Sequence, residues 1–210
     1  MTNSIPERSS APLRLKRLSL VFLTAFLFFL FNRSLPAGEP DSAVQETPNF
    51  GRDYAGLCGA CHGERGISNN SMVPSLAGQD RSYLLGQLRA FRDQRRHHAA
   101  MEGVLSKLTE DDITYMAAYY AKQRPMAGKG PSRKIKKGEP LYDGCKGCHG
   151  GRAEGGEGIP RLAGQKASYL EGELLDYQTG IRSTAGMNEA VARLTPKEIE
   201  ALSRYLSSLK

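Results

Sequence analysis

Residues 58–63 read Cys-Gly-Ala-Cys-His-Gly, and residues 145–150 read Cys-Lys-Gly-Cys-His-Gly. These two stretches contain all four cysteines of the 210-residue chain. Residues 74–88 and 160–174 are also alike: both begin Pro-x-Leu-Ala-Gly-Gln, and ten of their fifteen positions are identical. A spacing of 86 to 87 residues is too long for a solenoid and is typical of a duplicated small domain. The sequence therefore contains one domain twice.

The boundary between the two copies lies in a segment rich in proline and glycine. Residues 125–131 read Pro-Met-Ala-Gly-Lys-Gly-Pro, and four basic residues follow within the next six positions. Such a composition predicts a linker. We therefore expect a first domain at residues 49–131 and a second domain at residues 132–210.

Both copies show the periodicity of helices. Apolar residues recur at helical spacing from Ser82 to Arg95, and the matching segment of the second copy repeats the pattern. The last helix of each copy is preceded by a capping-box signal, Thr109-x-x-Asp112 in the first and Thr195-x-x-Glu198 in the second. No segment alternates polar and apolar residues over a sustained length, as a half-buried strand does. The sequence predicts an all-α fold of two domains.

The N-terminal segment has the features of an export signal. Arg14, Lys16 and Arg17 precede an almost uninterrupted apolar run from Leu18 to Phe31. As a helix this run is about 21 Å long, which is short of the roughly 30 Å thickness of a bilayer's hydrocarbon core. We therefore interpret residues 1–37 as a signal peptide cleaved near Ala37, with an uncleaved N-terminal anchor as the alternative. Residues 38–48 are expected to be a flexible lead-in to an exported protein.

The distribution of charge along the chain argues against nucleic acid as a partner. The formal charge of +7 owes much to residues 1–37, which contain five basic residues and one acidic residue. Residues 38–210 contain 24 basic and 21 acidic residues, a nearly balanced set. A nucleic-acid-binding domain needs a concentrated basic surface.

Cys-x-x-Cys followed directly by His is the signature of covalent c-type haem attachment. Cys58 and Cys61, like Cys145 and Cys148, are spaced to add to the two vinyl groups of one porphyrin, and His62 and His149 then face the iron. Domains of this size bury little apolar surface and often need a cofactor, a metal or disulfides. Disulfides within each motif would close only tiny loops and leave the histidines unexplained. A zinc site needs closer motifs, and a thioredoxin-like pair needs a βαβ context. We predict two covalently bound haem c groups.

The second axial ligand of each iron should be a residue that occurs at equivalent positions in the two copies. Met101 and Met187 are such a pair, at 39 and 38 residues after His62 and His149. Both are expected in polar loops between helices, although core packing is an alternative role for a methionine. His97 and His98 are the rival ligands for the first haem, but Ser183 and Thr184 occupy the equivalent positions in the second copy. Met116 matches Leu202 and is expected in the core.

These motifs together resemble the dihaem cytochromes c4, exported bacterial electron carriers with two tandem class I cytochrome c domains. The resemblance covers residues 48–210 and rests on both Cys-x-x-Cys-His motifs, both Pro-x-Leu-Ala-Gly-Gln segments and the paired methionines. It implies that the carbonyls of Pro74 and Pro160 accept a hydrogen bond from the haem-binding histidines. It also implies a periplasmic location and electron delivery from a quinol–cytochrome complex to a terminal oxidase.

With His and Met on opposite faces, an iron has no free position for a substrate, so the expected chemistry is one-electron transfer rather than enzymatic turnover. The alternative is a dihaem electron-accepting subunit of a periplasmic dehydrogenase, such as a flavocytochrome sulfide dehydrogenase. A dihaem peroxidase would need an open coordination position and a longer chain. Redox proteins are thus the predicted partners, and the N-terminal segment could add a membrane association.

Overall fold

The computed structural model describes residues 50–128, 130, 132, 135–184 and 186–210, and these belong to one compact unit. The expectations for residues 1–48 lie outside the described residues. Within the described residues, no helix combines the length and the apolar character that a membrane crossing requires.

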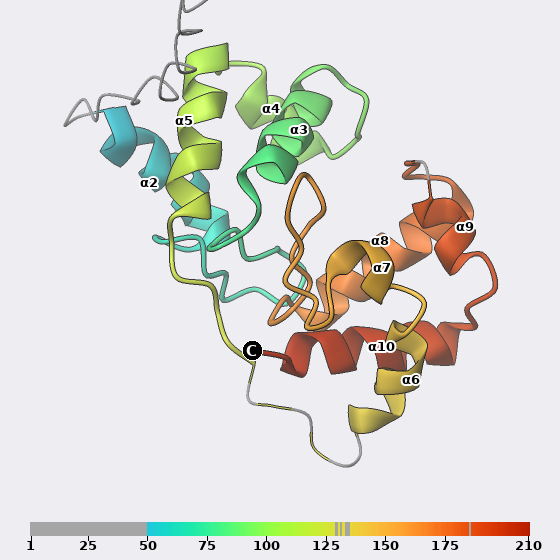
Figure 1. The fold of residues 1–210 in the computed structure, drawn as a ribbon. Coiled ribbons are helices and arrows are strands. Elements are labelled where there is room, and N and C mark those ends of the chain that lie inside the picture. Colours follow the sequence, from blue (N-terminus) through green and yellow to red (C-terminus); the bar gives the residue numbers. More distant parts are fainter. Residues whose placement is uncertain (1–49, 129, 131, 133–134, 185) are drawn as a thin grey trace, which may run out of the picture. The chain divides into compact units, whose positions relative to one another are not determined.

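The described part of the first repeat contains four helices: α2 (Phe50–His62), α3 (Arg81–Arg92), α4 (Ala99–Leu105) and α5 (Glu110–Ala121). Helix α5 packs against α3 and α2, and α4 packs against α3, as Figure 1 shows. Apolar residues at helical spacing line the contact between α3 and α5. The buried core residues on these helices are Leu84, Ala90, Phe91, Leu105, Ile113, Met116, Ala117 and Tyr120.

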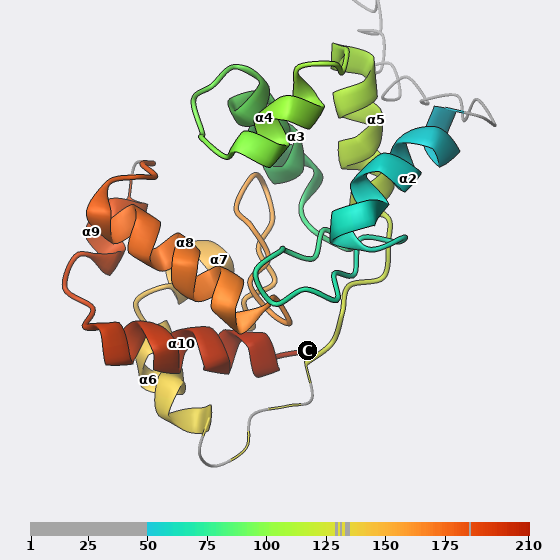
Figure 2. The same cartoon turned by 180° about the vertical axis from the view of Figure 1, so that it is seen from behind.

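The second repeat is built around two long helices that correspond to α3 and α5. Helix α10 packs against α8 and against the short helices at the start of the repeat (Figure 2). The elements of the second repeat are η1 (Ile135–Gly138), α6 (Glu139–Tyr142), α7 (Lys146–His149), α8 (Ala167–Thr179), α9 (Met187–Val191) and α10 (Pro196–Ser208). Its core consists of Tyr142, Ala153, Ala163, Leu170, Leu202, Tyr205 and Leu206.

Capping boxes start the last helix of each repeat, as predicted. The Thr109 hydroxyl accepts a hydrogen bond from the Asp112 N–H at 3.2 Å, and the Asp112 carboxylate accepts one from the Thr109 N–H at 2.7 Å. Thr195 and Glu198 exchange the same two bonds at 3.3 Å and 2.8 Å. Each box satisfies two backbone donors that a helix N-terminus leaves without an intrahelical partner.

The fold is all-α. Among the described residues the nearest approach to a sheet is an isolated bridge between Gly156 and Ile159. Met116 is buried, in agreement with the interpretation of this methionine as a core residue.

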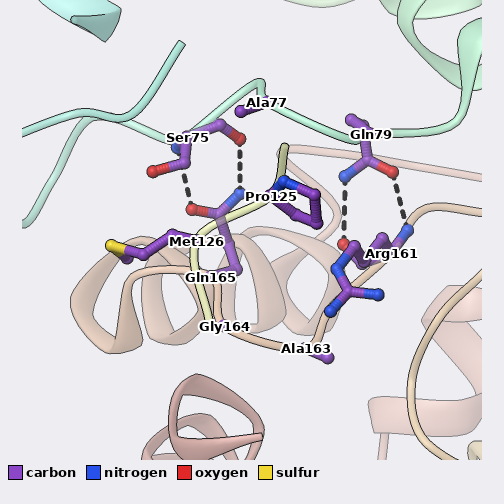
Figure 3. Close-up of a pocket in the computed structure, with 9 residues that line it drawn as sticks. All are labelled: Ser75, Ala77, Gln79, Pro125, Met126, Arg161, Ala163, Gly164 and Gln165. Atoms are coloured by element: carbon purple, nitrogen blue, oxygen red, sulfur yellow. Dashed lines mark hydrogen bonds between the residues drawn. The ribbon is translucent and has the colours of Figure 1, made fainter. Parts of the chain in front are cut away.

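The repeated Leu-Ala-Gly-Gln segments join the two repeats. The Gln79 amide donates to the Arg161 carbonyl at 3.0 Å and accepts from the Arg161 N–H at 2.7 Å. The Gln165 amide makes the same two bonds with the backbone of Ser75, at 2.8 Å and 2.9 Å. Figure 3 shows both pairs around a pocket that Pro125 also lines. These four hydrogen bonds connect the two repeats at this pocket.

Candidate functional site

The first Cys-x-x-Cys-His motif forms the C-terminal turn of α2. Cys58 is half-buried, Cys61 is exposed, and His62 is the last residue of the helix, with only 8% of its surface exposed. Residues three positions apart lie on the same side of a helix, so both thiols are presented together.

The His62 imidazole is held by the backbone of the following loop. Its Nδ1 lies 2.9 Å from the Pro74 carbonyl oxygen, which accepts the ring N–H. That loop is itself fixed, because the Gly66 carbonyl accepts hydrogen bonds from the N–H groups of Leu76 and Ala77 at 2.7 Å and 3.0 Å. Nε2 is therefore the ring nitrogen left to bind a metal.

The second motif lies on a shorter helix, and its histidine is placed in the same way as that of the first motif. Cys145 is the N-cap residue of α7, Cys148 is exposed, and His149 ends the helix with 5% of its surface exposed. The His149 Nδ1 lies 3.0 Å from the Pro160 carbonyl oxygen. The Ala153 carbonyl accepts from two backbone N–H groups here, as Gly66 does in the first repeat.

A glycine follows each histidine because the chain must turn sharply out of the helix. Gly63 and Gly150 have φ angles of +83° and +84°. A Cβ on Gly63 would lie 2.1 Å from the Ile67 carbonyl oxygen. Glycine adopts a positive φ without the steric cost that a Cβ would bring. Each turn sends the chain toward the loop that carries the proline.

Tyr142 is hydrogen-bonded to the backbone of the second motif. Its side chain is fully buried, and its hydroxyl donates to the Gly150 carbonyl next to His149. Burial raises the pKa of Tyr142 to about 12, so the hydroxyl remains a donor across the neutral range.

The protonation states suit metal binding. Burial lowers the pKa of His62 and of His149, against the opposing effect of the proline carbonyls, so both rings are neutral at pH 7. A neutral imidazole is the form that ligates a metal. None of the four cysteines forms a disulfide in the structure.

The residues present fit c-type haem. Each repeat offers two thiols for the vinyl groups and a buried imidazole whose Nδ1 is already bonded, which leaves Nε2 for the iron. No cluster of three or more His, Cys, Asp or Glu side chains suited to a metal ion occurs in the described part of the chain.

The two methionines lie in short helices, not in the loops that we expected. Met101 is the third residue of α4, and Met187 is the first residue of α9. Both side chains are half-buried, and Met101 packs beside Leu105 and Phe91. The prediction of loops was wrong because polar and small neighbours, such as Gly186, also occur at the start of a short helix. Their role as iron ligands stays a prediction.

His97 and His98 lie at the start of α4. The His97 side chain is 73% exposed, and its Nδ1 is 3.3 Å from the Glu102 carboxylate. His98 is the N-cap residue of α4 and is also exposed. The surface location expected for both histidines agrees with the structure.

Comparison with known proteins decides the family. The chain is 36% identical over 174 residues to cytochrome c4 of Pseudomonas aeruginosa, covering 76% of this chain and 87% of that protein. The chain belongs to the cytochrome c4 family. A crystal structure of reduced recombinant cytochrome c4 from Pseudomonas stutzeri superimposes with a TM-score of 0.72 at 34% identity, covering 76% of this chain and 97% of that one. The family model for cytochrome c matches residues 135–210.

A relative with a more specific role is also similar. The thiosulfate dehydrogenase electron acceptor of Thiomonas intermedia is 34% identical over 171 residues, covering 73% of this chain and 79% of that protein. Cytochrome c4 proteins are dihaem c-type electron carriers, and both cysteine pairs here have the spacing for haem c. The chain is therefore a dihaem electron-transfer protein and not an enzyme.

Proposed function

We propose that this member of the cytochrome c4 family is a periplasmic carrier of single electrons from a quinol–cytochrome complex to a terminal oxidase. The supporting observation is that both repeats present the same set: two thiols, and a buried imidazole tied by Nδ1 to a proline carbonyl. Bound haem c supplies one-electron iron chemistry. The apolar stretch at residues 18–31 supports export.

The proposed roles follow the repeat. Cys58 and Cys61 attach the first haem, and Cys145 and Cys148 attach the second. His62 with Met101, and His149 with Met187, would bind the two irons. The Pro74 and Pro160 carbonyls orient the rings and increase the electron donation of Nε2 to the iron.

Replacing a methionine tests the axial roles. We expect Met101→Ala to make one haem of the two high-spin and able to bind carbon monoxide, and to lower its potential, because thioether ligation favours the ferrous state. Met187→Ala should do the same to the other haem. Optical and resonance Raman spectra with redox titration measure this. Met116→Ala is the matched control, since Met116 lies in the core and should change stability without opening an iron. If Met101→Ala leaves both haems unchanged, His97 and His98 become the candidates.

A second candidate function is that of electron acceptor for a periplasmic dehydrogenase. The similarity to the thiosulfate dehydrogenase electron acceptor of Thiomonas intermedia supports it. The chain would then receive its electrons from a substrate-oxidising enzyme rather than from a quinol-oxidising complex.

Native purification separates the two candidates. The holo-protein is isolated from the periplasm, and the proteins bound to it are identified. Its reduction is then followed with membranes plus quinol, and separately with thiosulfate plus the soluble periplasmic fraction. The carrier role requires fast reduction by quinol and oxidation by the oxidase. Reduction only in the presence of thiosulfate would overturn that role in favour of the acceptor role.

A further inference from the structure

A buried carboxylate connects the two repeats. The Glu173 carboxylate on α8 pairs through one oxygen with the Arg96 guanidinium of the first repeat and through the other with the Arg182 guanidinium of the second. The three side chains are only 9–15% exposed. One carboxylate thus pairs with an arginine of each repeat at a place largely closed to water.

Further hydrogen bonds complete this cluster. The Gln87 side-chain oxygen accepts from Arg96 at 2.9 Å and from Arg182 at 2.7 Å. Arg96 also donates to the Tyr169 hydroxyl at 3.3 Å, and Arg182 donates to the Tyr83 hydroxyl at 3.1 Å. Each guanidinium therefore bonds to side chains of both repeats.

Both arginines are also held within their own repeat. The Arg96 guanidinium carbon lies 4.5 Å from the centre of the Phe91 ring, and that of Arg182 lies 4.7 Å from the centre of the Tyr177 ring. Stacking on an aromatic face fixes the plane of a guanidinium and so limits where its donors point.

The residues of the cluster occupy equivalent positions in the two repeats. Four pairs of residues are related by an offset of 86: Tyr83 and Tyr169, Gln87 and Glu173, Phe91 and Tyr177, Arg96 and Arg182. Each arginine contacts the tyrosine of the other repeat, which is the reciprocal pattern of a two-fold interface. The Gln79 and Gln165 bonds to the opposite backbones are reciprocal in the same way. The pair that breaks the symmetry in charge is Gln87 and Glu173.

One other acid lies near the cluster. Asp176 follows Glu173 by three positions on α8 and interacts electrostatically with Arg96 and Arg182, but among the described residues no ion pair joins it to either. Glu173 is thus the carboxylate that bridges the repeats. Removing one partner of a buried ion pair is strongly destabilising, because the remaining charges stay buried.

We propose that Glu173, Arg96 and Arg182 are positioning residues that hold the two haem domains in one fixed arrangement for electron exchange between them. This inference rests on the proposed two-haem carrier. The haems that the two cysteine pairs would hold would supply the one-electron chemistry, so that one centre would be oxidised as the other is reduced. Arg96, Arg182 and Glu173 are not among the residues that would hold the haems; they set the separation and orientation of the domains, on which the rate depends.

The reciprocal geometry provides a sharp test on the full-length holo-protein. Glu173→Gln removes the bridge. Asp176→Asn is the matched control, because it removes the same charge from the same helix without breaking an ion pair. The double variant Gln87→Glu/Glu173→Gln moves the carboxylate to the equivalent position, where it would again lie between both arginines. The measurements are the intramolecular electron-transfer rate after photochemical reduction and the small-angle X-ray scattering profile.

We expect Glu173→Gln to slow the intramolecular transfer by about tenfold or more and to broaden the distribution of sizes in solution. Asp176→Asn and the double variant should stay close to the wild type in both measurements. Wild-type behaviour of Glu173→Gln in both would overturn the inference. If Glu173→Gln does not accumulate with haem, the double variant decides: its recovery supports the bridge, and its failure beside a normal Asp176→Asn overturns it.

Failure of the proposed function gives a different result. A wild-type protein without intramolecular electron transfer would contradict the two-haem carrier, whatever the variants do. The scattering profiles of the same variants would still decide whether the Glu173 bridge fixes the arrangement of the domains.

Discussion

At the scale of single residues, the duplication provides an internal reference for each position. Ser203 on α10 and Ala117 on α5 are equivalent, and both are completely buried. The Ser203 hydroxyl oxygen has no hydrogen-bond partner among the described residues. A buried hydroxyl without a partner costs free energy, and the first repeat avoids this cost with a methyl group.

We therefore expect Ser203→Ala to raise the free energy of unfolding by about 1 kcal/mol, from the removed polar group and the better helix propensity of alanine. Denaturant unfolding of the holo-protein measures this. Ser208→Ala is the control on the same helix: its hydroxyl donates to the Tyr205 carbonyl at 2.6 Å, so its loss should lower stability by about 1 kcal/mol. A Ser203→Ala protein less stable than the wild type would contradict the prediction.

At the scale of helices, local sequence signals were sufficient where the structure depends on near neighbours. The capping boxes at Thr109 and Thr195 were predicted because all their hydrogen bonds lie within four residues. The apolar spacing of α3 and α8 was recognised for the same reason. The short helices α4 and α9 were predicted to be loops, because a helix of one or two turns has too few residues to show a periodicity.

The cap of α10 leads to a prediction about pH. Hydrogen bonds from the Thr195 backbone and hydroxyl hold the pKa of the Glu198 carboxyl below its ordinary value. Because the folded pKa is below the unfolded one, the ionised carboxylate stabilises the fold above the unfolded pKa, and this contribution is lost as pH falls through the folded pKa. Stability should thus fall below about pH 4.3, the ordinary pKa of Glu, and Glu198→Gln should fall less steeply there, since Gln can still accept the bonds.

Removing the cap itself should act at every pH. Thr195→Ala is expected to cost about 1 kcal/mol of unfolding free energy, and Thr109→Ala about the same in the other repeat. Urea unfolding at pH 7 and pH 4 measures both effects. A Glu198→Gln protein with the same acid sensitivity as the wild type would contradict the role given to this carboxylate.

At the scale of the whole molecule, the sequence indicated the duplication and the candidate haem ligands but not the contacts between the repeats. Arg96 and Glu173 pair across the two repeats although they are 77 residues apart in the sequence, and nothing in their local sequence marks them as buried. A signal was nevertheless present: Arg96 and Arg182 are separated by 86 residues, as are Gln87 and Glu173. Charged residues that obey a domain repeat beside variable neighbours are candidates for a shared interface.

The charge balance of the whole molecule determines how it should meet its partners. Residues 38–130 contain 11 basic and 11 acidic residues, and residues 131–210 contain 13 and 10. Part of the positive charge is enclosed in the Arg96–Glu173–Arg182 cluster, and the four ionised propionates of two haems would slightly exceed the three excess positive charges. No large field of one sign is then left to steer association.

We therefore expect electron transfer to and from partner proteins to be weakly sensitive to salt. The second-order rate constant, measured by stopped flow from low to physiological ionic strength, should change by less than about tenfold. Salt screens charges beyond roughly 8 Å, but the protein has no strongly charged surface whose steering effect this screening would remove. Lys136→Glu/Lys137→Glu is the comparison variant, since both lysines are exposed and the change makes the second domain acidic. A fall of several orders of magnitude for the wild type would contradict this expectation and would point to a charged docking patch for one oppositely charged partner.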